Sequence, residues 1–389
     1  MIEPRVIAPV PRRPRRDSLS TYSRFALIAV CMVATACAGH APEPRTTNQV
    51  FRELISSISE APGYFDTDNL LSNERSYLHV LSDIRKAGIK GGAYLGVGPD
   101  QNFSYIAEID PEIAFIIDIR RDNVLQHLMF KALFTESRSR LEYLALLFGR
   151  PVPEGRGRGS ETALEELIQY VDDTPPTVSS RRVARDRVDR AVRSFGLELA
   201  EEDFATIQRF HDEFIDAGLG MRFRSHGRAP RFYYPTYRDL LLEGDRNGRR
   251  ANYLAGEELF RTVQRLQRED RIVPVTGDLA GDHALRAIGE HLTRRGLAVS
   301  AFYTSNVEFY LFGSGDFNRF VENLRALPLA EHSVIIRSVF HALRGPHPRA
   351  VPGYYSTQLA QRADLLIRRF SEGSYRSYWD VVTRDILDD

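Results

Sequence analysis

The stretch from Gly92 to Asp118 limits the possible folds of this chain more than any other part of its sequence. It begins with a short apolar segment, Gly92–Gly98, which ends in a glycine turn and leads into a helix expected over Pro99–Ala107. A continuous apolar run, Ile113–Asp118, follows and ends in a carboxylate. Runs without polar alternation are typical of parallel strands that are buried on both faces. The stretch therefore predicts a strand–helix–strand unit of a parallel sheet.

The same alternation returns nearer the C-terminus, after a long segment without strand character. Strands are expected at Ile272–Val275, Ala298–Tyr303 and Ser333–Arg337, with helical sequence between them. Strands that alternate with helices at this spacing favour an open α/β sheet. We therefore expect a Rossmann-like, mostly parallel core built from residues 61–122 and 270–345.

The residues between and beyond these two core segments are expected to be mainly helical. Residues 123–269 predict a large helical insertion, in which Phe204, Ile207 and Phe210 mark one apolar helix face. Residues 346–389 predict a C-terminal helical extension. The predicted fold class is thus α/β, with a Rossmann-like sheet interrupted by a helical insertion.

The first 37 residues have the composition of an export signal. Six arginines precede or flank an apolar run, Phe25–Ala36, whose twelve residues are too few for a spanning helix of roughly 20 but suit a signal-peptide core. The string Ala34-Thr35-Ala36-Cys37 resembles the lipobox of bacterial lipoproteins, in which the cysteine is acylated. The resemblance implies lipidation of Cys37, a tether over residues 38–60, and an exported protein anchored in the membrane of the cell envelope, on its periplasmic or surface face. A simple small-x-small cleavage site is the alternative.

Composition excludes several kinds of chemistry. Basic and acidic residues balance at 52 each, which disfavours a sequence-independent nucleic-acid binder, because such proteins normally carry excess positive charge. Cys31 and Cys37 are the only cysteines, and both lie in the signal segment, so the rest of the chain has no thiol nucleophile, disulfide or cysteine-ligated zinc. The histidines lack paired helical spacing, and neither a P-loop nor a Gly-x-Ser-x-Gly motif occurs. No metal is expected.

Gly96, Gly98 and Asp118 are the first candidates for a ligand site. Ligands of open α/β sheets bind at the carboxyl ends of the strands, where a glycine turn lets the backbone approach them. Asp118 follows Gly96 by 22 residues, close to the ~20 expected for a carboxylate that accepts ribose hydroxyls. The third glycine of a dinucleotide motif is missing, and the charge of Asp100 disfavours a pyrophosphate at this turn. A nucleoside-type ligand without phosphate is therefore favoured over NAD or FAD.

This arrangement resembles the class I S-adenosylmethionine methyltransferases. They combine a Gly-x-Gly turn, an acidic residue that ends strand two and often an Asp after strand three, and their fourth strand often presents a polar cluster to the transferred methyl. By this resemblance, and from the acidic residues near the turn, we expect S-adenosylmethionine to be bound by Glu74, Gly96, Gly98, Asp100, Asp118, Asp278 and Leu279. The catalytic candidates in the fourth-strand cluster are Ser305, Asn306 and Glu308.

Longer runs of the chain are similar to an uncharacterised bacterial lipoprotein family with a methyltransferase-like domain, for which no reaction is established. The runs that carry this resemblance are Tyr64–Asn69, Gly96–Asn102, Asp118–Asn123, Asn252–Ala255 and Ser305–Tyr310. They span most of the chain after the signal segment. The resemblance implies the fold and leaves the reaction open.

Each candidate residue also has a purely structural alternative. The fold itself requires a glycine turn between strand and helix, and Asp118 could serve only to cap the helix that follows it. Asn73 and Glu74 could be a helix cap and a partner of the helix dipole. Asn306 and Glu308 could belong to a structural hydrogen-bond network.

Two functions stay open at this point. The first is a methyltransferase-like protein of the cell envelope that uses S-adenosylmethionine on an acceptor that the sequence does not reveal. The second is a non-catalytic lipoprotein that binds a nucleoside-type small molecule or a partner, because an exported enzyme would work where this cytoplasmic cofactor is not expected. A short-chain oxidoreductase is disfavoured, since no lysine follows a tyrosine by four residues.

Overall fold

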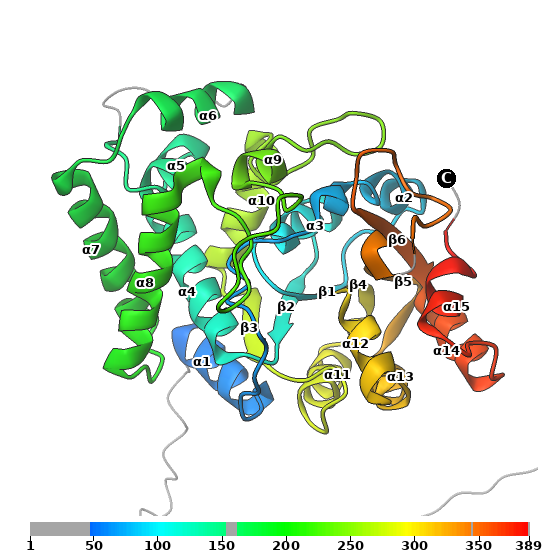
Figure 1. Ribbon diagram of the computed structural model, residues 1–389. Helices are drawn as coiled ribbons and strands as arrows, with labels where there is room; N and C mark the ends of the chain where they lie inside the picture. The colour runs from blue at the N-terminus through cyan, green and yellow to red at the C-terminus, as the bar shows by residue number, and fades with distance from the viewer. Residues whose placement is uncertain (1–46, 153–161, 344, 388–389) are drawn as a thin grey trace, which may run out of the picture. The chain divides into compact units, whose positions relative to one another are not determined.

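The computed structural model describes residues 47–152, 162–343 and 345–387 (Figure 1). The described residues all belong to one compact unit, which extends over Thr46–Asp389. The predicted signal peptide and its lipidated cysteine lie outside the described residues, so export and anchoring stay predictions. Within the three described ranges, no helix is long and apolar enough to cross a membrane.

Six strands form one sheet in the order β3-β2-β1-β4-β5-β6. The first five strands run parallel to their neighbours, whereas β6 is antiparallel to β5. This arrangement confirms the predicted α/β class with a mostly parallel sheet. The strands are β1 (Ala93–Val97), β2 (Ile113–Asp118), β3 (Ile272–Thr276), β4 (Val299–Ser305), β5 (Leu329–Phe340) and β6 (Ser356–Arg362).

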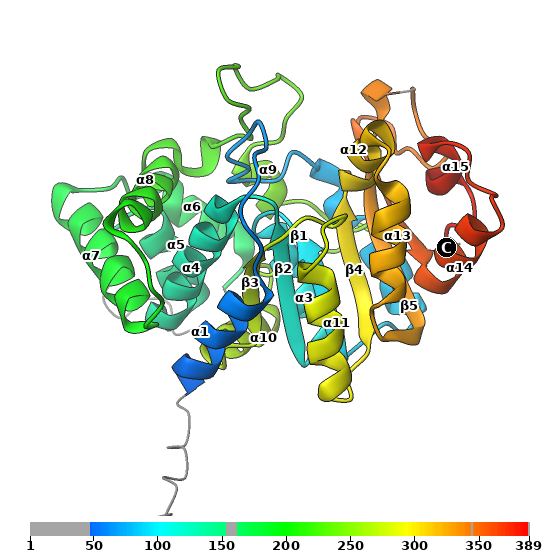
Figure 2. The same cartoon turned by 90° about the horizontal axis from the view of Figure 1, so that it is seen from below.

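Helices cover both faces of this sheet (Figures 1 and 2). On one face α3 (Gln101–Ile109) packs against α10 (Glu257–Arg268), while α11 (Ala284–Arg294) and α13 (Phe317–Arg325) lie together on the other. α1 (Thr47–Ile58) joins the second layer through contacts with β3 and α11. The remaining helices outside the insertion are η1 (Arg75–Leu78), α2 (Leu81–Lys86), α12 (Val307–Ser314), η3 (His341–Leu343), α14 (Ala363–Ser371) and α15 (Tyr378–Thr383).

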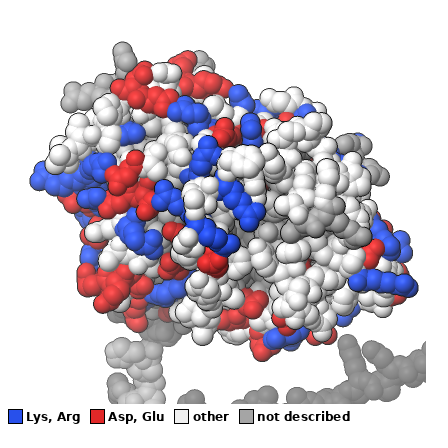
Figure 3. All heavy atoms as spheres, viewed as in Figure 1, with Lys and Arg blue, Asp and Glu red and all other residues white. Residues whose placement is uncertain are grey.

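The segment between β2 and β3 is helical, as predicted, and belongs to the same compact unit as the sheet. α4 contacts both β2 and β3, and α10 covers α3. α7 and α8 pack against α4 and expose interspersed acidic and basic side chains (Figure 3), among them the pair Arg181–Asp216. The helices of this segment are α4 (Arg121–Glu136), α5 (Arg140–Leu147), α6 (Leu164–Asp173), α7 (Val178–Ser194), α8 (Glu201–Ala217), η2 (Gly218–Gly220), α9 (Tyr237–Leu241) and α10.

The prediction of a tether is wrong for residues 47–58, because they form α1. Phe51, Ile55 and Ile58 recur at helical spacing and are buried in the core. These three residues are interspersed with Leu54 and with polar residues, so the stretch has no continuous apolar run although it carries one apolar helix face.

The prediction of a helical extension over residues 346–389 is wrong in part, because β6 lies within it. The β6 sequence Ser-Thr-Gln-Leu-Ala-Gln-Arg has too few apolar residues to indicate a buried strand. The structure buries it because its polar side chains find partners, as when Gln358 Nε2 donates to the Tyr105 hydroxyl at 2.9 Å. Buried polar groups that are hydrogen-bonded are tolerated in protein cores.

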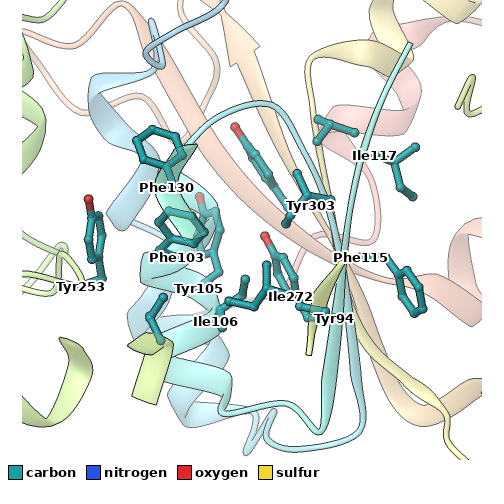
Figure 4. Packing of buried hydrophobic residues seen from close by; sticks show 14 of the residues in the cluster. Tyr94, Phe103, Tyr105, Ile106, Phe115, Ile117, Phe130, Tyr253, Ile272 and Tyr303 are labelled. Atoms are coloured by element: carbon teal, nitrogen blue, oxygen red, sulfur yellow. The ribbon is translucent and has the colours of Figure 1, made fainter. Parts of the chain in front are cut away.

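Aromatic side chains fill the space between the sheet and the helices that cover β1 (Figure 4). Phe103 on α3 makes edge-on contacts with Phe130 at 5.5 Å and with Tyr253 at 5.4 Å between ring centroids. Tyr105, two residues further along α3, lies 5.0 Å from the ring of Tyr303 on β4. This packing fixes α3, and with it the glycine turn that precedes α3, against the ends of β1 and β4.

Candidate functional site

A cavity of about 470 Å³ lies at the carboxyl ends of β1, β2, β3 and β4. Its wall is formed by the loops that leave these four strands, by α12 and Asp316, which follows it, by the segment 65–74 and by Phe223. Its volume falls in the range of about 300–1,000 Å³ that is usual for small-molecule sites. The cavity is therefore where the parallel sheet predicts a ligand.

Seven of the ten residues predicted for the site line this cavity. They are Glu74, Gly98, Asp118, Asp278, Leu279, Ser305 and Asn306. The structure does not bring Gly96, Asp100 and Glu308 to the cavity wall.

The two glycines of the turn are required for different reasons. Gly98 has a φ of +83°, which favours glycine, and its carbonyl accepts hydrogen bonds from Asn123 at 3.1 Å and from His127 at 2.9 Å. Burial lowers the pKa of His127 to about 4, so its ring is neutral at pH 7. A Cβ at Gly96 would lie 1.9 Å from Asn102 Oδ1. Gly96 is thus required by the approach of α3, and its prediction as a ligand contact is wrong.

Asp100 is buried on the far side of the turn, away from the cavity. Its Oδ2 accepts hydrogen bonds from the hydroxyls of Tyr237 at 2.6 Å and Tyr253 at 3.2 Å. Burial raises the pKa of Asp100 to about 6. The prediction that Asp100 edges the site is wrong, because its side chain lies among tyrosines that the helical insertion brings to α3.

Glu308 forms a buried ion pair and does not face the cavity. Arg337 Nη2 on β5 lies 3.1 Å from Glu308 Oε1, and Arg337 Nε lies 2.6 Å from Oε2. Both side chains are fully buried. Burial raises the pKa of Glu308, and the charge of Arg337 opposes that change. The structure therefore gives Glu308 a place in the link between α12 and β5, outside the cavity wall where the catalytic prediction put it.

Glu74 is a carboxylate in the cavity wall that has no positive partner. It is 2% exposed, the hydroxyls of Tyr303 and Ser305 donate hydrogen bonds to it, and no cation of the described residues forms an ion pair with it. Burial raises the pKa of Glu74, which the hydrogen bonds only partly offset. Its side chain makes no capping bond to the helical turn that follows. A buried carboxylate without a partner is expected to attract a cationic ligand group.

Gln101 adds a second polar side chain beside Glu74, although no sequence pattern singled it out. Its Nε2 donates to the Tyr303 hydroxyl at 3.3 Å, whereas its Oε1 is buried and finds no hydrogen-bond partner in the described part of the chain. An unsatisfied acceptor in the cavity wall favours a ligand that brings hydrogen-bond donors. A glutamine at the start of a helix is common, so only the folded geometry reveals this role.

Two cavity residues other than glycine adopt a left-handed backbone conformation. Ser305 has a φ of +53° and Asn69 a φ of +51°. This conformation is tolerated by asparagine but is uncommon for serine, and such positions cluster at functional sites. At Ser305 it accompanies the hydrogen bond that the hydroxyl donates to Glu74.

The carboxylate of Asp118 is already engaged by Arg120. Arg120 Nε donates to Oδ1 at 3.0 Å, Nη2 donates to Oδ2 at 2.7 Å, and the backbone N–H of Arg120 donates to Oδ1 at 2.9 Å. Arg120 Nη1 also holds the carbonyls of Thr67 and Asp68, at 2.7 and 2.6 Å. A carboxylate has about four acceptor positions, so a ligand finds Asp118 mostly occupied. The sequence signal for this interaction is the spacing Asp-x-Arg, in which Arg120 follows Asp118 by two residues.

Asp278 is the freer of the two strand-end carboxylates. Its Oδ1 accepts from the backbone of Ala280 at 2.9 Å, and its own N–H donates to Glu60 at 3.0 Å. Glu60 Oε1 also accepts from the N–H groups of His283 at 2.8 Å and Ala284 at 2.6 Å, at the start of α11. Glu60, which the sequence placed in a tether, therefore fixes the loop that presents Asp278.

The cavity carries a net negative charge from its own side chains. Four carboxylates and one guanidinium line it: Glu74, Asp118, Asp278, Asp316 and Arg120. Within the described ranges, no group of three or more His, Cys, Asp or Glu residues could hold a metal ion. The acidic side chains, together with apolar wall residues such as Ile117 and Leu311, suit a cationic group that brings hydrogen-bond donors and is joined to an apolar part.

Comparison with protein families gives one match. A family described as a domain of unknown function, DUF7790, matches residues 70–378. This range covers most of the chain and includes all ten predicted site residues. A search of curated proteins found no match.

Proposed function

This chain belongs to the DUF7790 family, and we propose that it is a methyltransferase-like protein of the cell envelope that binds S-adenosylmethionine in the cavity at the end of β1. The observation that carries the proposal is Glu74, a buried carboxylate without a positive partner in an acidic cavity. The proposal concerns the ligand first, because binding precedes any transfer.

The topology supports a nucleoside-type ligand at this place. Strand order reverses between β1 and β4, where the chain continues outward in opposite directions. Open α/β sheets of the Rossmann-like type bind ligands at such a reversal, in the crevice beyond the carboxyl ends of the strands. Gly98 and Ser305, which follow β1 and β4, both line the cavity.

Charge separates S-adenosylmethionine from other nucleosides. It is a net cation, because it has two positive groups, the sulfonium and the ammonium, and one negative carboxylate. S-adenosylhomocysteine has no net charge, and NAD is an anion. The excess of carboxylates around the cavity should favour the cation and disfavour the anion. Arg120 neutralises Asp118, whereas Glu74 and Asp278 form no ion pair with a described residue and are left to face the cation.

The residues present fit different parts of this ligand. Asp278, with one carboxylate oxygen free of the bond to Ala280, would accept hydrogen bonds from the adenine amine or the ribose. Glu74 and Gln101 would face the cationic end of the ligand. Glu74 has no positively charged partner, and the Oε1 atom of Gln101 accepts no hydrogen bond within the described residues. When bound, the sulfonium group supplies an activated methyl. Ser305 and Asn306 line the wall next to Glu74, where an acceptor could approach.

Calorimetric titration of the full chain tests the proposal. We expect S-adenosylmethionine to bind most tightly, S-adenosylhomocysteine less tightly and NAD least. Asp278→Asn should weaken S-adenosylmethionine by about 10- to 150-fold, the equivalent of charge-assisted hydrogen bonds worth roughly 1.5–3 kcal/mol. Asp282→Asn is the matched control, since that side chain is 90% exposed and does not line the cavity. Tighter binding of NAD than of the sulfur nucleosides would refute the proposal.

A second candidate function is a non-catalytic protein that binds the same nucleoside. It is favoured by the two ion pairs that occupy Asp118 and Glu308, because they remove two acidic groups expected to serve the site. Incubation of the folded protein with methyl-labelled S-adenosylmethionine and isolated envelope fractions separates the two functions. Transfer of label supports the methyltransferase, whereas bound but unchanged nucleoside supports the non-catalytic protein.

A further inference from the structure

A second hollow, which we call the aromatic recess, borders the cavity at Asn73. It has a volume of about 250 Å³ and is formed by three segments that are distant in sequence: residues 73–75, 222–239 and 353–356. Asn73 lines both hollows and hydrogen bonds the Tyr234 hydroxyl. The recess therefore adjoins the candidate site and is separated from it by one side chain.

The recess presents aromatic rings to solvent. The rings of Tyr233 and Tyr355 stack at 4.6 Å with an interplanar angle of 26°, and Phe232 contacts both of them edge-on. Phe232 is 84% exposed and Tyr355 is 48% exposed. Exposed rings gathered from two segments are unusual on a protein surface unless a ligand or a partner covers them.

The recess also contains a positive charge without a carboxylate partner. The guanidinium of Arg222 donates to the carbonyls of Phe232 and Tyr234, and it forms no ion pair with any described residue. Arg75 is paired with Glu243 at 3.0 Å. The remaining charged residue in the wall, Asp239, accepts hydrogen bonds at Oδ2 from the N–H and hydroxyl of Thr236 at 2.8 and 2.7 Å, as the third residue of the α9 capping box. Its charge interacts with both Arg75 and Arg222 without forming an ion pair with Arg222. Arg222 is thus the group available to an anion.

We propose that the aromatic recess binds a ligand with a planar ring that carries an anionic group. A ring can stack on Tyr233 or Tyr355, which pairs apolar faces, while Arg222 offers N–H donors and charge to a phosphate or carboxylate. The recess has room for one substituted ring. The anion would be drawn to the recess and repelled from the neighbouring cavity, which is lined by four carboxylates.

The opposite charges of the two hollows suggest a division of roles. A cationic nucleoside in the cavity and an anionic ring compound in the recess would meet at Asn73. That the ring compound is the methyl acceptor rests on the proposed function, whereas its binding in the recess does not. The acceptor class inferred in this way is an aromatic acid or an aromatic phosphate ester.

Titration of the full chain with phenyl phosphate tests the recess, with phenol and inorganic phosphate as probes that lack the anion or the ring. We expect phenyl phosphate to bind more tightly than either probe. Arg222→Gln should weaken phenyl phosphate by about 10-fold or more and leave phenol unchanged, since only the charge-assisted bonds are removed. Tyr355→Ala should weaken both ring compounds, and it leaves Arg222 in place.

Two controls match these variants in the type of side chain that is removed. Arg224→Gln removes an arginine two residues away that pairs with Glu213, and Tyr64→Ala removes a ring that is 76% exposed; neither residue lines the recess. Both controls should bind phenyl phosphate like the unaltered chain. Absence of saturable binding, or equal affinity in the Arg222 and Tyr355 variants and their controls, would overturn the proposal.

Failure of the recess proposal can be distinguished from failure of the proposed function. The titration is made without any nucleoside, so phenyl phosphate can bind even if the cavity takes no S-adenosylmethionine. If S-adenosylmethionine binds and phenyl phosphate does not, the recess proposal fails alone. If phenyl phosphate binds and S-adenosylmethionine does not, the recess is supported and its role as an acceptor site is withdrawn.

Discussion

Asp100 should make the stability of this protein depend on pH in a direction opposite to most carboxylates. Burial between Tyr237 and Tyr253 raises the pKa of Asp100 from its ordinary 3.8 to about 6. The folded state therefore binds this proton more tightly than the unfolded state, so its contribution to stability is present at low pH and is lost as the pH rises through about 6.

Asp100→Asn should abolish this dependence. At pH 7 the variant is expected to be more stable than the unaltered chain by up to roughly 3 kcal/mol, the equivalent of the difference between the two pKa values. The gain should shrink as the pH falls from 6 to 4 and disappear below about pH 3, where Asp100 is protonated in both states. Urea unfolding at several pH values measures it, with the exposed Asp282→Asn as control. A gain of equal size at pH 4 and pH 7 would show that the buried charge is not its cause.

The position of a residue could be predicted where it follows the carboxyl end of a parallel strand. It could not be predicted where a contact with one distant side chain determines it. Asp118 and Asp278 end parallel strands, so the sheet itself carries both to the cavity. Asp100 lies only two residues after Gly98, yet its side chain faces Tyr237, which is 137 residues further along the chain. No local pattern contains that partner. The same holds for Gln101, whose role depends on Tyr303.

The helix α12 and the strand β5 are joined by the buried pair of Glu308 and Arg337. Arg337→Met should cost about 3–5 kcal/mol, because it leaves the carboxylate of Glu308 buried without a partner. The double change Glu308→Leu and Arg337→Met should restore most of the loss, since two apolar side chains leave no charge to compensate. Chemical unfolding measures both. The double variant should also keep its affinity for S-adenosylmethionine, and a large loss of affinity would instead give Glu308 a role in the site.

The helices and strands that could be predicted have a clear apolar pattern in their sequence. Those in which apolar and polar residues are mixed could not be predicted. β2 is apolar at every position but its last, so its sequence alone predicts a buried strand. β6 is held by hydrogen bonds of Gln358 and its neighbours, and α1 by three spaced apolar residues, so neither has a continuous run. The backbone pairing that selects a strand is a long-range contact, and the sequence of the segment does not display it.

At the scale of the whole described unit, the cavity is assembled from parts that the sequence keeps far apart. Glu74 meets Ser305 across more than 200 residues, and Phe223 comes from the helical insertion. The parallel α/β class of the sheet could be predicted, because alternating strands and helices imply a parallel sheet. The acidic character of the site was expected, and Glu74 and Asp278 lie in its wall as predicted. Asp316 was not selected, two expected carboxylates are buried elsewhere, and Arg120 holds Asp118.

The most direct test of the central claim is the affinity of the Glu74→Gln variant for a charged and an uncharged nucleoside. Calorimetric titration of the full chain with S-adenosylmethionine and with adenosine separates charge from shape. Glutamine keeps the size of the side chain and removes its charge, so we predict that S-adenosylmethionine is weakened by at least about 10-fold while adenosine changes little. Equal affinities of the variant and the unaltered chain for S-adenosylmethionine, in a protein that unfolds at the same temperature, would contradict the account.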